Sequence, residues 1–418
     1  MSAPRSLEQH PLQHPMQHPP TAARAAARPR LAEVDFDAAP FLVIWETTQA
    51  CDLACIHCRA SAIPRRDPRE LTTDEAFRLL DTVRRFGRPL FVLTGGDPLK
   101  RPDTEEIVRY GARAGLRMAM TPSGTPLMTP EVLERLRDAG LSRLAVSLDG
   151  STAALHDHFR GVAGSWAWTV GMLEAARDLG LSTQINTTIS SHNVHDLEPL
   201  IHLMERLGIA LWSVFFIVPT GRARPEDLAS AEEFERTFHR LYDLSATAPF
   251  DIKTTAAPHY RRVILQRQRA ERRAGERDEV PIPMTGGVGF SLADGVGRAK
   301  GVNDGDGFVF VSHRGEIYPS GFLPLSAGNV RTDDLVDVYR NHELFRALRD
   351  RDRLKGKCGA CEYRSVCGGS RARAYAMTGD PLEADPLCAY VPPAWARRMD
   401  ALGGAMEAAA HDRIATGA

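Results

Sequence analysis

The seven cysteines of this chain fall into two groups, and their spacing is the first sign of chemistry. Cys51, Cys55 and Cys58 form a C-x3-C-x2-C run directly after an apolar segment at 41–44 that has the character of a strand. Three thiolates can hold three corners of a [4Fe–4S] cluster, whose usual ligand set is four cysteines, so one iron remains able to bind a small molecule. His57 lies within the run, so a structural zinc site of these four residues is the alternative.

The second group lies near the end of the chain and contains Cys358, Cys361, Cys367 and the more distant Cys388. Four thiolates make a closed metal site, and the spacing alone allows either an iron–sulfur cluster or zinc. No cysteine lies between the two groups. This distribution fits metal ligation in a reducing compartment better than disulfide bonds.

Length and composition describe a globular protein with more than one domain. A chain of 418 residues predicts a large catalytic domain with a smaller appendage. The net charge of −1 gives no reason to expect nucleic acid or a membrane surface as a partner. The longest apolar run, 211–218, is too short to span a bilayer, and the N-terminus lacks the apolar core of a signal peptide. A cytoplasmic location is therefore expected.

The elements that must position the cysteines alternate between strands and helices from residue 41 onward. Capping residues and apolar spacing predict the first helix from Thr72 to Phe86. Further helices are expected at 105–114, 130–138, 166–179 and 197–207, and strands at 41–44, 90–93, 117–120, 144–148, 183–188 and 211–218. This order predicts an α/β fold, a partial (β/α)6 TIM-like barrel, with 251–255 as a candidate for a further strand. Barrel enzymes keep their chemistry at the C-terminal ends of the strands, where the first cysteine run lies.

Polar residues follow several of the predicted strands. Gly95 and Gly96 let backbone approach a ligand closely, and Asp97 can accept a hydrogen bond from an ammonium group. Ser147 and Asp149 at the end of the fourth strand suit ribose hydroxyls, although Asp149-Gly150 alone is also typical of a turn.

Together, these motifs resemble those of the radical S-adenosylmethionine (SAM) enzymes. The resemblance lies in the cysteine run with its lead-in from Trp45 and in Gly95-Gly96-Asp97-Pro98, where Asp97 replaces the usual Glu. It implies that Cys51, Cys55 and Cys58 hold a [4Fe–4S] cluster whose open iron binds SAM. It also implies SAM contacts from nine residues, namely His57, Gly95, Gly96, Asp97, Ser123, Ser147, Asp149, Arg160 and Asn186.

The C-terminal part resembles the SPASM/twitch domain that carries auxiliary iron–sulfur clusters. A hairpin at 308–319 and a helix at 334–349 are expected there, followed by the four cysteines as ligands of a second [4Fe–4S] cluster. Ser320 and Ser370 stand where members with two auxiliary clusters carry cysteine, so one auxiliary cluster is expected. The predicted organisation is a disordered tail (1–32), the barrel (33–265), a charged segment and Gly-rich linker or lid (266–307), the auxiliary-cluster domain (308–395) and a C-terminal tail (396–418).

The resemblance implies an oxidoreductase that reductively cleaves SAM to a 5′-deoxyadenosyl radical and takes hydrogen from a substrate. The details resemble most the subgroup of haem d1 and alternative haem synthesis, so a tetrapyrrole side chain is the expected target. A ribosomal peptide matured by the same chemistry is the alternative, and a non-catalytic iron–sulfur sensor or zinc scaffold is the alternative from another class.

The expected partners are that small-molecule or peptide substrate and a reducing electron donor such as flavodoxin or ferredoxin. No catalytic acid or base can be identified from the sequence. The segment from Lys253 to Arg262 either faces the barrel mouth and holds substrate carboxylates, or its residues Arg261 and Arg262 begin a solvated helix.

Overall fold

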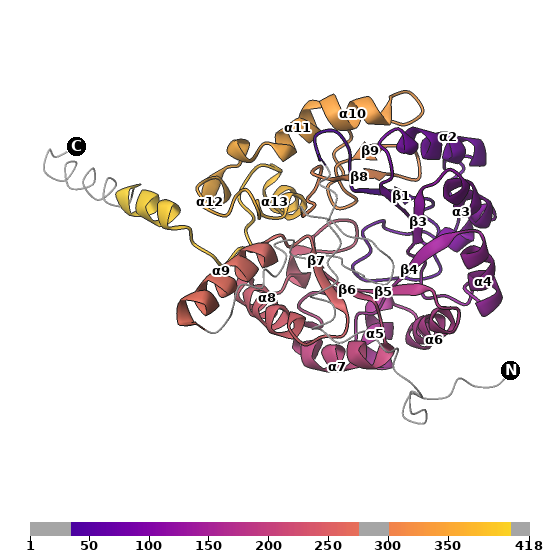
Figure 1. Cartoon of the computed structure of the whole chain (residues 1–418), viewed down its shortest axis with the longest axis horizontal. Helices are drawn as coiled ribbons and strands as arrows, with labels where there is room; N and C mark the ends of the chain where they lie inside the picture. The colour runs from indigo at the N-terminus through magenta and orange to yellow at the C-terminus, as the bar shows by residue number, and fades with distance from the viewer. Residues whose placement is uncertain (1–34, 276–300, 403–418) are drawn as a thin grey trace, which may run out of the picture.

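A computed structural model describes residues 35–275 and 301–402. One nine-stranded sheet runs through the molecule in the order β7-β6-β5-β4-β3-β2-β1-β8-β9. Figure 1 shows the sheet curled into an incomplete barrel with helices around its outside. The strands are β1 (Leu42–Glu46), β2 (Leu90–Thr94), β3 (Arg117–Met120), β4 (Leu141–Ser147), β5 (Ser182–Ile189), β6 (Leu211–Phe216), β7 (Asp251–Thr255), β8 (Phe308–Val311) and β9 (Ile317–Tyr318).

The strands from β1 to β8 pair in parallel, and only β9 is antiparallel to its neighbour. The α/β partial barrel expected from the sequence is confirmed, and it is larger than six strands. The segment at 251–255 does add a strand, β7, beside β6. The hairpin expected at 308–319 forms, and its first strand β8 pairs with β1, so it continues the barrel sheet.

The helices that cover the barrel follow their sequence signals closely. For α2, the Thr72 hydroxyl and the Glu75 carboxylate form the expected capping box. The barrel helices are α2 (Thr73–Arg84), α3 (Thr104–Arg113), α4 (Pro130–Asp138), α5 (Ala153–Arg160), α6 (Ser165–Asp178), α7 (Leu197–Leu207), α8 (Ala231–Ser245) and α9 (His259–Ala274).

The C-terminal part contains short helices. They are α10 (Leu335–Asn341), α11 (Glu343–Arg349), α12 (Gly356–Gly359) and α13 (Arg371–Thr378). The single helix expected at 334–349 is wrong, because His342 takes an extended conformation and its side chain caps α11 by accepting from the Leu344 N–H. The predictions for 1–32, for 276–300 of the linker and for 403–418 of the tail lie outside the described residues, and the domain boundaries stay a prediction.

The core lies between the sheet and its helices and aligns the strand ends. Trp45, Phe91, Met118 and Leu144 are fully buried along neighbouring strands. The register pairs Glu46 with Thr94 at the last position of β1 and β2. Loops that follow parallel strands therefore gather at one end of the barrel, where the first cysteine run also lies. Among the described helices, none has the length and apolar character needed to cross a bilayer.

Candidate active site

The first three cysteines lie on the loop after β1 and line one cavity at the C-terminal end of the barrel. Cys51 and Cys55 are each 7% exposed. Residues from the ends of five other strands share the cavity wall, among them Gly95 and Gly96 after β2, Ser123 after β3, Ser147 on β4, Asn186 on β5 and Phe216 on β6.

Backbone hydrogen bonds from neighbouring loops fix the shape of the cysteine loop. The N–H of Gly96 donates to the Thr48 carbonyl at 2.8 Å, and the N–H of Asp97 donates to the Ala50 carbonyl at 2.7 Å. A Cβ on Gly96 would lie 2.3 Å from the Ala50 oxygen, so only glycine permits this approach. The glycine pair was expected to let backbone approach a ligand; it also lets two loops approach each other.

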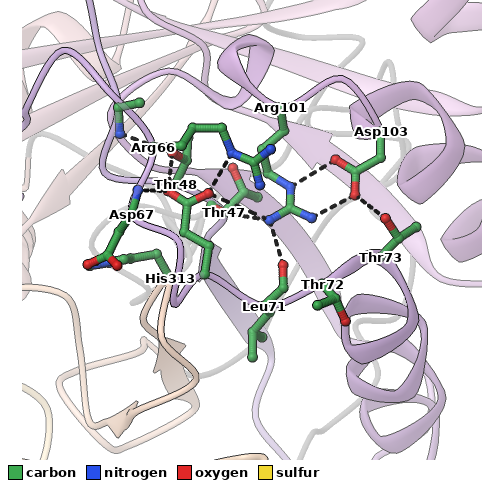
Figure 2. Close-up of polar contacts among 12 residues, drawn as sticks. Thr47, Thr48, Arg66, Asp67, Leu71, Thr72, Thr73, Arg101, Asp103 and His313 are labelled. Carbon is green, nitrogen blue, oxygen red and sulfur yellow. Dashed lines mark hydrogen bonds and ion pairs between the residues drawn. The ribbon is translucent and has the colours of Figure 1, made fainter.

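A buried polar network supports the start of the same loop (Figure 2). The Arg101 guanidinium donates to the carbonyls of Leu71 at 2.8 Å and Thr47 at 3.3 Å, and it pairs with Asp103 at 2.6 Å. The Thr48 hydroxyl donates to the Glu70 carboxylate at 2.5 Å. Arg101 therefore links the loop after β2 to the residues just before the first cysteine.

The three sulfur atoms have the surroundings that iron-bound thiolates require. Each accepts an N–H: Cys51 from Leu53 at 3.3 Å, Cys58 from Ala62 at 3.4 Å and Cys55 from the Arg160 guanidinium at 3.7 Å. Burial raises the pKa of the Cys51 thiol to about 11, so at neutral pH iron must displace a proton to bind there. These residues fit an iron–sulfur cluster.

His57, the fourth residue of the zinc alternative, lies in the cavity wall with its ring centroid 4.2 Å from that of Phe159. Burial, and secondarily the charge of Arg160, lowers its pKa well below the usual value, so the imidazole is neutral. Within the described residues, no group of three His, Cys, Asp or Glu side chains is arranged to hold a single metal ion.

Seven of the nine residues expected at SAM line this cavity, and two do not. The residues in its wall are His57, Gly95, Gly96, Ser123, Ser147, Arg160 and Asn186. Four buried polar atoms of its lining residues, His57 Nδ1, His156 Nε2, Arg160 Nε and Thr169 Oγ1, have no hydrogen-bond partner in the described part of the chain. Unpartnered buried polar atoms of this kind suit a polar ligand.

Asp97 and Asp149 lie behind the wall, both fully buried. The Asp97 carboxylate accepts from the Thr125 hydroxyl at 2.8 Å and from the Leu99 N–H at 3.1 Å. The Asp149 carboxylate accepts from the Thr188 N–H at 2.7 Å and pairs with Arg160. In this structure neither carboxylate lines the cavity, and both are held by donors from within the protein.

Arg160 joins the Asp149 carboxylate to the Cys55 sulfur. Burial alone would lower its pKa, but the charges of Asp149 and Cys55 raise it, so the guanidinium stays cationic. It stands at the end of α5, a helix that the sequence analysis missed although Thr152 caps its start and Gly161 its end.

The four C-terminal cysteines line a second, smaller cavity, together with His259 and Arg262 from α9. Cys361 and Cys367 accept backbone N–H groups at 3.4 Å, and the Arg371 guanidinium lies 3.7 Å from the Cys358 sulfur. Burial raises the pKa of the Cys367 thiol to about 12. This donor set also suits an iron–sulfur cluster.

Both expectations for the segment from Lys253 to Arg262 are wrong, and none of its residues lines the barrel cavity. Arg261 and Arg262 are 5% and 2% exposed, so they do not begin a solvated helix, and neither lines the barrel cavity. Arg262 pairs with Glu235 at 2.5 Å in the wall of the second cavity, and Arg261 donates to the Val366 carbonyl at 3.1 Å.

The two serines that stand in place of cysteine have structural roles. The Ser370 hydroxyl caps α13 by accepting from the Arg373 N–H, and Ser320 is fully buried and accepts from the Phe322 N–H. Residues on the cavity wall that the sequence analysis did not single out include Arg59, Phe215 and Phe322. Its position directly after Cys58 is the only feature of the sequence that pointed to Arg59.

Comparison with known proteins agrees with this geometry. A family profile described as the Radical SAM superfamily matches residues 45–204. The AdoMet-dependent heme synthase of Methanosarcina barkeri is 44% identical over 354 residues, which cover 85% of this chain and 97% of that protein. The AdoMet-dependent heme synthase of Nitratidesulfovibrio vulgaris is 41% identical over 353 residues, covering 84% and 92%.

The fold also resembles a solved structure, Streptococcus suis SuiB bound to S-adenosylmethionine. The TM-score is 0.63 at 16% identity, and the match covers 84% of this chain and 78% of SuiB. At this identity the likeness concerns the fold.

Proposed function

We propose that this chain, which belongs to the radical SAM superfamily and is a SAM-dependent iron–sulfur enzyme, acts on an iron tetrapyrrole with carboxylate side chains. The proposed product is haem. The observation that carries this proposal is the 44% identity to a heme synthase over 97% of that protein's length.

When bound, the cluster and SAM would supply the radical chemistry, namely reductive cleavage of SAM to a 5′-deoxyadenosyl radical that takes a hydrogen atom from the substrate. In the proposed site Cys51, Cys55 and Cys58 hold the [4Fe–4S] cluster and leave one iron open to SAM. Ser123 donates to the Gly96 carbonyl at 2.7 Å and lies 3.2 Å from the Cys51 sulfur, so it joins the cluster loop to the SAM-facing glycines.

The remaining expected contacts are assigned by their place on the wall. His57, Gly95, Gly96, Ser147, Arg160 and Asn186 would face SAM directly. Asp97 and Asp149 would affect SAM binding indirectly. Asp97 would hold the loop after β2 in place, and Asp149 would hold Arg160 in place.

A single auxiliary [4Fe–4S] cluster, held by Cys358, Cys361, Cys367 and Cys388, belongs to the same proposal. Its support is the common cavity of the four thiols and the structural use of Ser320 and Ser370, which leaves no further thiol for a second cluster. A reducing protein such as flavodoxin or ferredoxin would supply electrons, and a cytoplasmic location would suit both the thiols and that donor.

Two alternative functions that the sequence allowed can be tested by experiment. A non-catalytic sensor or zinc scaffold has no support in the comparisons. A ribosomal peptide substrate is a possible outcome of the test below, and the likeness to SuiB does not favour it because it concerns the fold.

The test uses anaerobically reconstituted full-length protein. We expect about eight irons, dithionite-driven formation of 5′-deoxyadenosine, and conversion to haem of iron coproporphyrin III, an iron tetrapyrrole with carboxylate side chains, detected by mass spectrometry. Each converted side chain would lose one hydrogen atom to the radical, one CO2 and one electron, for which the proposed auxiliary cluster is the acceptor. The triple variant Cys51→Ala/Cys55→Ala/Cys58→Ala should keep about four irons and form no 5′-deoxyadenosine. Cleavage of SAM without any change to the porphyrin would refute the proposed substrate while leaving the radical enzyme intact.

A further inference from the structure

The wall of the barrel cavity contains two chemically different kinds of residue. Cysteines, glycines, serines and an asparagine suit the cluster and SAM. Phe215, Ile217, Val218 and Phe322 add apolar surface to the same wall, and Val218 packs with Phe322. The rings of Phe215 and Phe322 lie 6.2 Å apart, so this wall offers aromatic and aliphatic surface to a flat apolar molecule.

Arg59 brings a cation to the wall of this cavity. Its guanidinium lies 4.7 Å from the ring centre of Phe310, donates to the Glu46 carboxylate at 2.5 Å and lies 3.5 Å from the Gly321 carbonyl. These contacts use two of the five N–H donors of a guanidinium. The side chain keeps 20% exposure, so it is held in place and still accessible.

A second set of contacts holds Glu46 in place. His313 donates through Nδ1 to the other Glu46 oxygen at 2.6 Å, and the Glu46 side chain is only 5% exposed. Burial alone would raise the pKa of Glu46, but the charge of Arg59 and the hydrogen bond from His313 outweigh it and lower the pKa. Glu46 is therefore ionised and orients Arg59 from behind.

The other cavity arginine does not offer the same site. Arg160 is paired with Asp149 and lies against the Cys55 sulfur, on the cluster side. On the Arg59 side, the next acidic group, Asp67, is paired with Arg69 at 2.9 Å and with Arg314 at 2.5 Å, and lies 4.0 Å from His313. The three arginines Arg59, Arg69 and Arg314 thus face the two carboxylates of Glu46 and Asp67, and this excess of positive charge favours an incoming anion.

We propose that Arg59 is the anchor for a carboxylate of the substrate, and that the substrate's flat apolar body lies along Phe215 and Phe322. This inference rests on the proposed function and adds to it the residue that recognises the carboxylate. A fixed guanidinium forms paired, charge-assisted hydrogen bonds to a carboxylate. A neutral ester has no negative charge and cannot form such a charge-assisted pair.

The experiment measures binding by absorbance titration on the reconstituted enzyme, with two probes and three proteins. The probes are iron coproporphyrin III, whose side chains end in carboxylates, and its methyl ester. The proteins are wild type, Arg59→Gln, and the control Arg240→Gln, which removes an arginine paired with Glu198 on the protein surface. Iron content and melting temperature are recorded for each protein.

The expected result is a Kd for the acid that rises about 10- to 100-fold in Arg59→Gln and is unchanged in Arg240→Gln. The ester should bind wild type and Arg59→Gln with similar affinity, because it has no charge for Arg59 to recognise. Arg59→Lys, which keeps the charge and loses the paired geometry, should lie between wild type and Arg59→Gln for the acid.

Other outcomes separate the two proposals. Equal affinity of wild type and Arg59→Gln for the acid would overturn the anchor and leave the proposed substrate standing. A loss of the same size for acid and ester would also overturn it, because that pattern indicates a structural role. If wild type binds neither probe, the proposed substrate fails and the anchor fails with it.

Discussion

Single residues set how closely the loops at the barrel mouth can approach one another. Gly96 touches the cysteine loop through backbone alone, and a Cβ there would meet the carbonyl groups of Ala50 and Gln49 at 2.3 and 2.7 Å. Backbone atoms cannot rotate away as a side chain can. The loop that carries Cys51, Cys55 and Cys58 therefore needs a glycine at position 96 to keep its shape.

Gly96→Ala should displace the cysteine loop, abolish SAM cleavage and remove about four of about eight irons. Iron analysis and 5′-deoxyadenosine assays measure both effects. Gly171→Ala is the matched control, because a Cβ there meets nothing within 4 Å and alanine favours the interior of α6 by about 0.5–1 kcal/mol. Full iron content in Gly96→Ala would contradict the steric argument.

His156 gives the protein a specific dependence on pH. Its Nδ1 accepts from the Asp149 N–H at 3.1 Å, and burial lowers its pKa from 6.5 to about 3. Between these values the unfolded state binds a proton that the folded state does not, so stability falls as pH falls from 6.5 towards 3, by up to about 1.4 kcal/mol per pH unit. His156→Gln should reduce this slope in denaturant unfolding between pH 7 and pH 5.

The exposed His202 provides the control, since its side chain is 68% accessible. His202→Gln should leave the pH slope of wild type unchanged. An identical slope in wild type and His156→Gln would show that the buried imidazole does not contribute to it.

At the scale of elements, the loops after β1 and β2 are joined by ionic contacts as well as by backbone. Arg101 is 1% exposed and faces Asp103, Glu70 and two carbonyl groups, so its charge is fully compensated inside the protein. Removing one partner of a buried ion pair leaves the other charge without compensation.

Arg101→Ala should lower the free energy of unfolding by about 3–5 kcal/mol. Arg135→Ala, which breaks a partly exposed pair with Glu105, should cost at most about 1 kcal/mol. Denaturant unfolding at neutral pH measures both. Similar losses in the two variants would indicate that the Arg101 network supports the loop no better than a surface pair.

At the scale of the whole molecule, the barrel contributes residues to the surroundings of the C-terminal cysteines, although the two parts are far apart in the sequence. β8 extends the barrel sheet through β1, and α9 of the barrel places Arg262 in the wall of the second cysteine cavity. Arg262 also lies 4.9 Å from the ring centre of Tyr390. One of the positive charges beside the proposed auxiliary cluster, that of Arg262, therefore comes from the barrel.

Arg262→Gln should lower the reduction potential of the auxiliary cluster, because a nearby cation stabilises the more negative reduced form. A redox titration followed by electron paramagnetic resonance measures this shift. Arg267→Gln, on the same helix and paired with Asp243 near the surface, should leave the potential unchanged. An unaltered potential in Arg262→Gln would contradict the electrostatic role.

The sequence by itself determined the fold class, the superfamily and the candidate cluster ligands, because these depend on local periodicity and on fixed spacing. The helices at 130–138 and 197–207 and the strand at 117–120 were predicted at their observed bounds, since caps and apolar patterns within each segment define them. The cysteine run carries its chemistry in its spacing in the same way.

Only the tertiary structure decided which side chains face the cavity. Asp97 and Asp149 stand in recognisable motifs, yet donors from Thr125, Leu99, Thr188 and Arg160 turn both carboxylates inward. Arg262 follows a strand with no local sign of burial, and its partners Glu235 and Tyr390 lie far from it in the sequence. Contacts between distant segments determine these orientations, so local sequence patterns do not contain them.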